Sequence, residues 1–295
     1  MVRKLWARYA LDTQTVPFIS LHSQKFSLKS FVNKNKIQSY MNFFELDYLL
    51  KQIPEDRIKN KNKRYLIQVK KNEKKPLVYE LPDLCRLHWL VLSRKVFNTL
   101  EIGSGFSTIF IADAKYILKK YFKKVENIRC EKQFHIYAIG ENKHFLNITK
   151  KRIPKNLLNY ISLIFNKVDI INYQGRFALK HRNLPNISPD LIYLDGPSLY
   201  SAKKKFMGFA FNNISRVPMS ADILFFEFFL EPGTFILIDG RGANAEFLKN
   251  FLKRNWKYFY DKKGDCHYFE LLEKPWGEWN RRKLKFCLGD KFNYF

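Results

Sequence analysis

The chain has 295 residues, of which 46% are hydrophobic and 17% aromatic, and its formal net charge is +26 at pH 7. It is long enough for one large α/β domain with an extension or for two small domains, and no uncharged apolar run is long enough to cross a membrane. The four cysteines lie far apart and no Cys or His pair has zinc-ligand spacing, so a structural zinc site is not expected. We expect free thiols in a cytoplasmic protein, with association with a membrane surface left open.

Two explanations of the positive charge remain open at this stage. A strongly basic chain favours nucleic acid, an anionic membrane surface or phosphate-bearing substrates as partners. Lys greatly outnumbers Arg, however, and it is spread along a sequence that is also rich in Asn, Ile and Phe. That profile is typical of a coding bias that raises Lys everywhere without selecting a partner.

Residues 1–80 are poorly patterned, and we expect a basic extension with a short amphipathic helix over residues 43–52. Residues 65–69 resemble a strand. The run of Lys, Asn and Arg at residues 59–64 is most simply a solvated surface, although it could bind anions.

The pattern sharpens from residue 82 onward. Asp83 is a candidate N-cap for a helix that ends near residue 95. His88 lies on the apolar face of this helix, and we expect it to be a packing residue. A buried strand over residues 97–102 follows, and a long helix begins at Ser107.

A glycine turn joins this strand to the long helix. Gly103 and Gly105 allow a tight turn that a ligand can approach closely, and the first backbone N–H groups of the helix face the same place. The dinucleotide fingerprint would have a third glycine where Thr108 stands. Glu101 ends the buried strand, where a carboxylate needs a partner. A ligand ammonium group and nearby backbone N–H groups are the two alternatives.

A second acid lies at the end of the next predicted strand, residues 134–139. Glu141 follows that strand, where a carboxylate can accept two hydrogen bonds from the vicinal hydroxyls of a ribose. Its separation from the glycine turn exceeds the usual spacing of about 20 residues. Glu126 and Glu131 are therefore alternatives, and the alternative role for Glu141 is to cap the predicted helix over residues 143–152.

Two later strands, residues 190–194 and 234–238, each end in an Asp-Gly pair, after a strand predicted over residues 161–168. In a parallel sheet with adjacent strands, Asp195 and Asp239 would lie about one strand spacing apart. Two carboxylates so placed could share a divalent cation or a substrate hydroxyl. The alternative is two ordinary turns, since both residue types favour them.

The remaining elements complete an alternating α/β pattern. Helices are predicted over residues 220–230 and 244–254. Two strands over residues 256–260 and 266–272 form a closing hairpin.

Over residues 80–275, this order of features resembles the class I S-adenosylmethionine-dependent methyltransferases. The resemblance implies an α/β, Rossmann-like fold with a mostly parallel seven-stranded sheet and a C-terminal antiparallel hairpin. We therefore divide the chain into an N-terminal basic extension at 1–80, a methyltransferase domain at 81–275 and a C-terminal basic tail at 276–295. The resemblance also places the S-adenosylmethionine donor on one group of residues: Glu101, Gly103, Ser104, Gly105 and Ser107 near its methionine side, Glu141 on its ribose, and Asp195 near the methyl group.

The two Asp-Gly sequences look most like those of the small-molecule and sugar O-methyltransferase branch. Some members of that branch bind magnesium through aspartates at the positions of Asp195 and Asp239. Gly240 stands where an Asn or a second Asp often follows, which weakens the metal prediction. Asp195, Asp239 or His267 could remove the acceptor's proton. Arg241 could bind a phosphate or carboxylate of the acceptor, or could be a surface arginine.

Three functions remain open. The first is O-methylation of a small molecule, sugar or glycan precursor. The second is methylation of RNA, suggested by the charge. Enzymes that methylate base amines usually carry a Pro-Pro-aromatic sequence where this chain has Gly196, Pro197 and Ser198, so base methylation is disfavoured but ribose methylation is not. The third is a non-catalytic domain that binds a partner.

Overall fold

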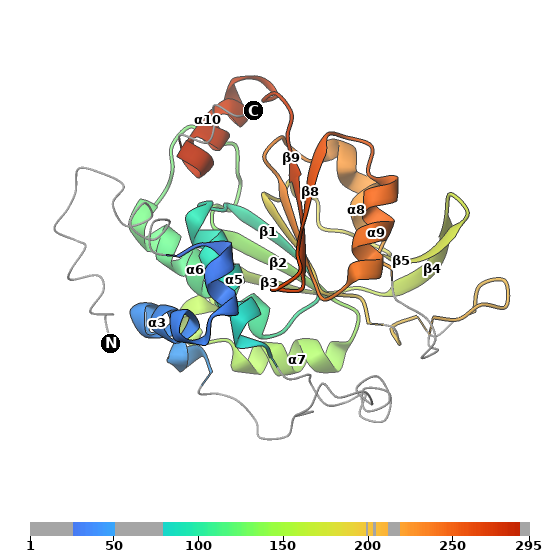
Figure 1. Cartoon of the computed structure of the whole chain (residues 1–295), viewed down its shortest axis with the longest axis horizontal. Coiled ribbons are helices and arrows are strands. Elements are labelled where there is room, and N and C mark those ends of the chain that lie inside the picture. The colour runs from blue at the N-terminus through green and yellow to red at the C-terminus, as the bar shows by residue number, and fades with distance from the viewer. Residues whose placement is uncertain (1–25, 51–78, 199, 203–204, 212–218, 290–295) are drawn as a thin grey trace.

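The computed structural model describes residues 26–50, 79–198, 200–202, 205–211 and 219–289. Its centre is a seven-stranded sheet with the order β3-β2-β1-β6-β7-β9-β8 (Figure 1). Every pair from β3 to β7 is parallel, and β9 is antiparallel to both of its neighbours. This arrangement confirms the predicted Rossmann-like methyltransferase fold. The strands are β1 (Asn98–Ile102), β2 (His135–Gly140), β3 (Ile161–Phe165), β6 (Leu191–Leu194), β7 (Phe235–Asp239), β8 (Trp256–Asp261) and β9 (Cys266–Leu271).

Helices cover both faces of the sheet (Figure 1). All five residues of β1 are buried, as expected for a central parallel strand. Leu100 and Ile102 pack in one core, beneath α8 and α9, so Thr99 and Glu101 point to the opposite core beneath α5 and α6. The helices are α3 (Lys34–Phe44), α5 (Leu81–Ser93), α6 (Phe106–Phe122), α7 (Lys143–Arg152), α8 (Asp222–Phe226), α9 (Gly242–Phe251) and α10 (Gly277–Leu288).

The helix predicted over residues 43–52 is wrong. Helix α3 ends at Phe44 because Glu45 adopts a left-handed conformation with φ 53°, and a 3₁₀ turn, η2 (Leu46–Leu49), follows. Tyr40 and Phe44 are buried in the core that also contains α5 and α6. The strand-like segment 65–69 and the charged run 59–64 lie outside the described residues.

Helix α5 begins earlier than predicted, with Glu80 as its N-cap. Asp83 is therefore no cap, and it forms an ion pair of 2.8 Å with Arg86, about one turn further along the helix. The packing role predicted for His88 is confirmed. Its Nδ1 lies 2.7 Å from the hydroxyl of Tyr40 and its Nε2 lies 3.0 Å from Asp113 Oδ2.

The strand predicted over residues 161–168 is in fact β3 followed by a separate hairpin. Strands β4 (Val168–Tyr173) and β5 (Arg176–His181) form a two-stranded antiparallel sheet. Gln174 and Gly175 have φ of 50° and 82°, as a tight two-residue hairpin requires. The helix predicted over residues 220–230 is also shorter, because α8 gives way to a 3₁₀ turn, η4 (Glu227–Phe229).

Residues 276–295 were expected to be a tail, but they contain α10. The Leu284 and Cys287 side chains are buried, and Lys283 Nζ lies 2.6 Å from Asp190 Oδ1 and 2.8 Å from Glu231 Oε2. The tail prediction failed because the inward-facing residues of this helix include polar ones. Within the described parts of the chain, no helix combines the length and apolar character needed to cross a membrane.

Candidate active site

The candidate site lies where the loops after β1 and β6 meet. Strand β1 pairs with β2 on one side and with β6 on the other, so the chain leaves β1 at the switch point where open α/β sheets bind ligands. The amide of Asp195 donates to Ile102 O at 3.0 Å. A Cβ on Gly196 would lie 2.9 Å from that same oxygen, and Gly103 has a φ of 132°. Both glycines are therefore needed for the close approach of these loops.

Glu101 is fully buried at the end of β1. The hydroxyl of Ser107 donates to its Oε1, and that of Thr108 donates to its Oε2 at 2.6 Å. The first turn of α6 therefore supplies partners that the sequence analysis did not foresee. Burial raises the pKa of Glu101 to about 8, and the nearby charge of Asp195 adds to this shift.

Substitution Glu101→Gln is expected to flatten part of the pH dependence of stability. Because the pKa of Glu101 is higher in the folded chain than in the unfolded one, the folded chain keeps a proton that the unfolded chain releases as pH rises. Stability is therefore expected to fall from about pH 5 to about pH 8, and to fall less in the variant. Thermal unfolding across this range measures the effect, and equal slopes would contradict a protonated Glu101.

The glycine turn has an open side. Gly105 is the N-cap of α6, and its amide donates to Thr108 Oγ1 at 3.0 Å. A Cβ on Gly105 would have no neighbouring heavy atom within 4 Å. Ser104 reaches toward the end of β2, since its Oγ would lie 3.3 Å from a Cβ on Gly140. Space beside the first turn of α6 is thus available to a ligand.

Glu141 links the end of β2 to the loop after β6. Its Oε1 accepts a hydrogen bond from Ser198 N at 2.9 Å and another from the hydroxyl of Ser201. The capping alternative is wrong, because Asn142 caps α7 by accepting from His144 N at 2.9 Å. The structure therefore places Glu141 beside the Asp195 loop, and its ribose role stays a prediction.

Asp195 and Asp239 lie at adjacent strand ends, because Leu194 and Ile238 are paired in register. Burial raises the pKa of Asp239 to about 6, with the charge of Asp195 contributing. The Asp239 carboxylate accepts from the Tyr193 hydroxyl at 3.4 Å. The predicted proximity of the two acids is thus present.

Asp239 also belongs to a polar cluster that the sequence analysis missed. One potential ligand atom each from Asp83, Asp239 and Cys266 lies within 4.8 Å of the others. The Arg86 side chain is buried against this group and donates to Asp83 and to Cys266 Sγ. Helix α5, strand β7 and strand β9 supply these residues from distant parts of the chain, so no local motif reveals the cluster.

The structure does not bring His267 to the two aspartates. Cys266 and Tyr268 face the core beneath α5 and α6, so His267 between them points to the opposite face of β9. Its Nδ1 lies 2.8 Å from the Tyr258 hydroxyl, and its ring stacks on Tyr260 with 4.3 Å between centroids. These contacts suit a structural histidine.

Arg241 lies at the crevice. Its Nη1 donates to Asp195 O at 3.2 Å and its Nη2 donates to Pro197 O at 2.8 Å, so it holds the loop after β6. Burial lowers the pKa of Arg241, while the charges of Asp195 and Glu141 oppose that shift. Within the described residues its Nε has no hydrogen-bond partner.

No family model and no curated protein matches this chain. Among solved structures, it is similar to the O-methyltransferase TomG from Streptomyces achromogenes, with 14% identity and a TM-score of 0.37 over 78% of this chain and 95% of that one. It is also similar to an O-methyltransferase from Bacillus cereus, with 14% identity and a TM-score of 0.39 over 80% of this chain and 100% of that one. A methyltransferase from Geobacter sulfurreducens has 13% identity and a TM-score of 0.38 over 78% of this chain and 96% of that one. Likeness this remote does not assign an activity, which must be argued from the site itself.

Proposed function

We propose that this chain is an S-adenosylmethionine-dependent methyltransferase that O-methylates a small molecule, sugar or glycan precursor. The observation that carries the proposal is the convergence of three acids on one glycine turn at the switch point of the sheet. Glu101 ends β1, and Glu141 and Asp195 border the same crevice from β2 and β6. A cytoplasmic location stays a prediction.

The residues present fit such a donor. The open side of Gly105 leaves room beside the N-terminus of α6, where backbone N–H groups favour a carboxylate. Glu101 lies behind this turn, and a cationic group of the donor would favour its ionised form and so lower the pKa that burial raises. Glu141 could accept from ribose hydroxyls after exchanging its bonds to Ser198 and Ser201. When bound, the donor supplies an electrophilic methyl group on a sulfonium.

The protein's own part in the reaction is alignment of the acceptor and removal of its proton. Asp195 and Asp239 border the acceptor side of the crevice, and the pKa of about 6 for Asp239 leaves it ionised and able to accept a proton near neutral pH. The Nε of Arg241 is buried and its Nη atoms hold the loop after β6, so Arg241 would bind a phosphate or carboxylate of the acceptor only if that loop moves. His267 has no part in this proposal because it faces away from the two aspartates.

A divalent cation shared by Asp195 and Asp239 fits this chain poorly. Gly240 offers no side-chain ligand, and Asp239 already accepts from Tyr193 and Cys266. The guanidinium of Arg241 is bound to the Asp195 backbone, so a fixed positive charge already lies beside this pair. We therefore assign no step to a metal.

Calorimetric titration with S-adenosylhomocysteine, with and without magnesium, tests the proposal. We expect a dissociation constant on the order of micromolar, unchanged by magnesium. Absence of binding by well-folded protein would contradict the proposed activity. Binding that strengthens with magnesium would contradict the argument against a metal. An acceptor screen with nucleotide sugars and RNA follows, and methylation of RNA alone would replace the small-molecule acceptor.

A further inference from the structure

Four exposed aromatic side chains lie on two segments that Arg254 joins, remote from the candidate active site. Phe228 and Phe229 in η4 are 65% and 77% exposed, and Trp276 and Trp279 at the start of α10 are 49% and 46% exposed. We call these four residues the aromatic cluster. Single exposed apolar side chains are common, but large rings gathered from two segments mark an interaction surface.

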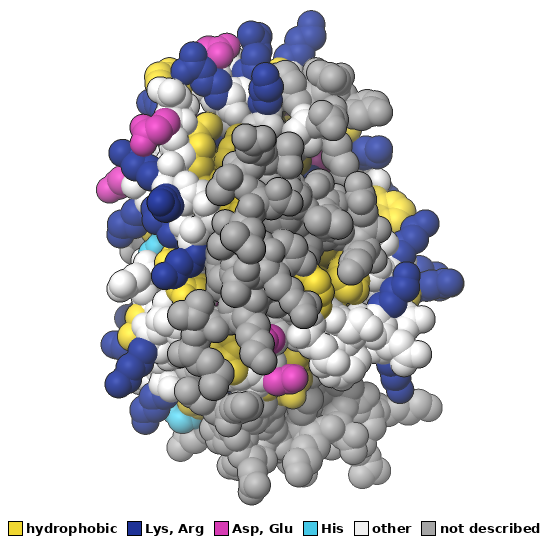
Figure 2. Space-filling view, turned by 90° about the vertical axis from the view of Figure 1, so that its left-hand side faces the viewer, with side chains coloured by type: hydrophobic (Ala, Val, Ile, Leu, Met, Phe, Trp, Pro, Cys, Tyr) yellow, Lys and Arg dark blue, Asp and Glu magenta, His cyan; other side chains and the backbone are white. Residues whose placement is uncertain are grey.

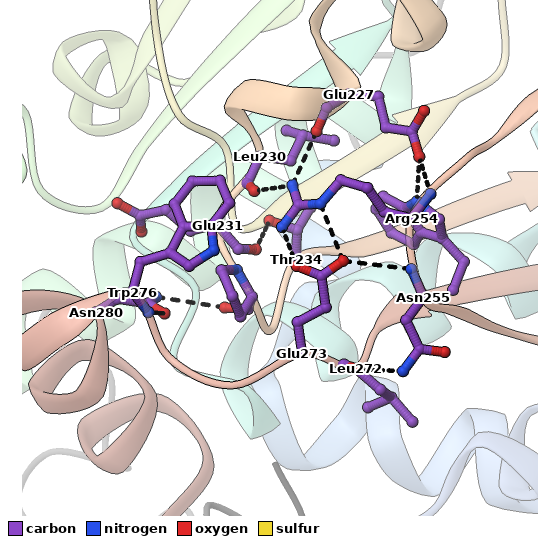
Figure 3. A network of polar contacts seen from close by, with 12 residues as sticks. Glu227, Leu230, Glu231, Thr234, Arg254, Asn255, Leu272, Glu273, Trp276 and Asn280 are labelled. Atoms are coloured by element: carbon purple, nitrogen blue, oxygen red, sulfur yellow. Dashed lines mark hydrogen bonds and ion pairs between the residues drawn. The ribbon is translucent and has the colours of Figure 1, made fainter.

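A buried polar network joins the two segments (Figure 3). Glu227, which precedes Phe228, accepts from the backbone amide of Arg254 at 2.9 Å. The Arg254 guanidinium donates to Glu227 O at 3.0 Å, pairs with Glu273 and lies 4.6 Å from the centre of the Trp276 ring. Turn η4 and the start of α10 are thus fixed relative to each other, and the exposure of the rings belongs to an ordered surface.

Helix α10 contributes its outer face. Leu284 and Cys287 point into the core, whereas Trp279 lies on the solvent side with the Arg282 guanidinium 5.5 Å from its ring centre. Its inner face is anchored through Lys283 to Asp190 and Glu231. Turning these tryptophans into the protein's own core would therefore require detaching this helix from the domain.

Positive charge surrounds the aromatic cluster. Among the described residues of these segments, Glu278 is the exposed acid, and it pairs with Arg281 and Arg282. Lys and Arg side chains gather at the upper end of the face in Figure 2, at the height where α10 lies in Figure 1. Five exposed cations lie close to the aromatic cluster along the chain. Lys253 precedes Arg254 of the polar network, and the segment that carries the two tryptophans contributes Lys274, Arg281, Arg282 and Lys285.

We propose that the aromatic cluster docks this protein on an anionic membrane surface. Tryptophan prefers the interface between lipid and water, phenylalanine rings insert their apolar surface there, and Lys and Arg are attracted to anionic head groups. The net charge of +26 complements such a surface. The two phenylalanines offer no polar group for a hydrogen-bonded partner, which favours lipid over a polar macromolecule.

The position of the aromatic cluster suits this role. Turn η4 leads into the start of β7, and Lys283 of α10 binds Asp190 just before β6. Both lie at the amino ends of the parallel strands, whereas the glycine turn and Asp195 lie at the carboxyl ends. Docking through the aromatic cluster therefore leaves the opposite, ligand-binding edge of the sheet facing away from the membrane.

Vesicle sedimentation with the full chain tests the proposal. We expect binding to vesicles of phosphatidylcholine mixed with phosphatidylglycerol, weak binding to phosphatidylcholine alone, and weakening by salt. The double variant Phe228→Ser/Phe229→Ser should bind the anionic vesicles at least about tenfold more weakly. Met207→Ser is the matched control, because Met207 is 75% exposed but lies outside the aromatic cluster.

Two further readouts keep the result unambiguous. Brominated lipids should quench tryptophan fluorescence in the wild type, and replacement of both Trp276 and Trp279 by Phe should remove that quenching. Thermal unfolding should show that the phenylalanine double variant is folded. Equal vesicle binding by the wild type and this variant would overturn the proposal. Absence of vesicle binding by the folded wild type would also overturn it, and a dimer or an RNA complex that the variant loses would then identify the partner of the aromatic cluster.

Discussion

Substitution Gly105→Val is expected to abolish binding of S-adenosylhomocysteine while the protein stays folded. Gly105 has an extended φ of 173°, which any residue adopts, and a Cβ there would meet no heavy atom within 4 Å. The free protein can therefore accommodate valine at the cost of a poorer N-cap, about 1 kcal/mol. Two added methyl groups would occupy the space beside α6 that the proposed donor needs. Calorimetric titration should show at least about a hundredfold loss of affinity.

Gly242→Ala is the matched control. Gly242 is the first residue of α9, and its added Cβ would make an ordinary contact 3.5 Å from His267 Nε2, on the other face of the sheet. This variant should bind S-adenosylhomocysteine like the wild type. If Gly105→Val also binds it at full strength, the donor does not lie against the open side of the glycine turn, and the proposed site is wrong.

The parts of the fold that sequence predicts well are those in which local signals agree. Strand β1 contains the apolar residues Leu100 and Ile102 and ends just before Gly103, and α7 lies between Asn142 and Pro154, which supply a cap and a stop. The proximity of Asp195 and Asp239 is also predictable from sequence, because each residue follows a strand and the two strands are parallel neighbours. Such features depend on a few neighbouring residues and on the regular geometry of the sheet.

Other features depend on contacts that no local pattern encodes. The direction of His267 is set by the register of β9 against β7, and a shift of one residue would reverse it. Arg86 and Cys266 meet across 180 positions of sequence. The partners of Glu101 lie only six and seven residues further along the chain, and the serine and threonine in the first turn of α6 are a signal that could have identified them. The sequence therefore predicts that the site lies at the carboxyl ends of the parallel strands. It predicts less well which side chains contact one another there.

Glu227→Ala is expected to be the most destabilising of the substitutions considered, with a loss of about 3 kcal/mol in the free energy of unfolding. The Glu227 carboxylate is buried and accepts from Lys253 N at 2.8 Å, Arg254 N at 2.9 Å and Trp256 Nε1 at 2.9 Å. Alanine would leave all three donors without this acceptor, and a small cavity would replace the carboxylate. Denaturant unfolding measures the loss.

Glu246→Ala is the control, because it removes an exposed carboxylate that accepts no comparable set of buried hydrogen bonds. Glu246 is 57% exposed on α9, and its Oε1 lies 3.6 Å from Lys249 Nζ, a distance and exposure at which an ion pair contributes little. This control should change the free energy of unfolding by less than about 0.5 kcal/mol. Because Glu227 also fixes η4, its loss should loosen Phe228 and Phe229 and weaken vesicle binding together with stability. A Glu227→Ala protein as stable as the control would show that the network joining η4 to β8 is not a main support of this edge of the domain.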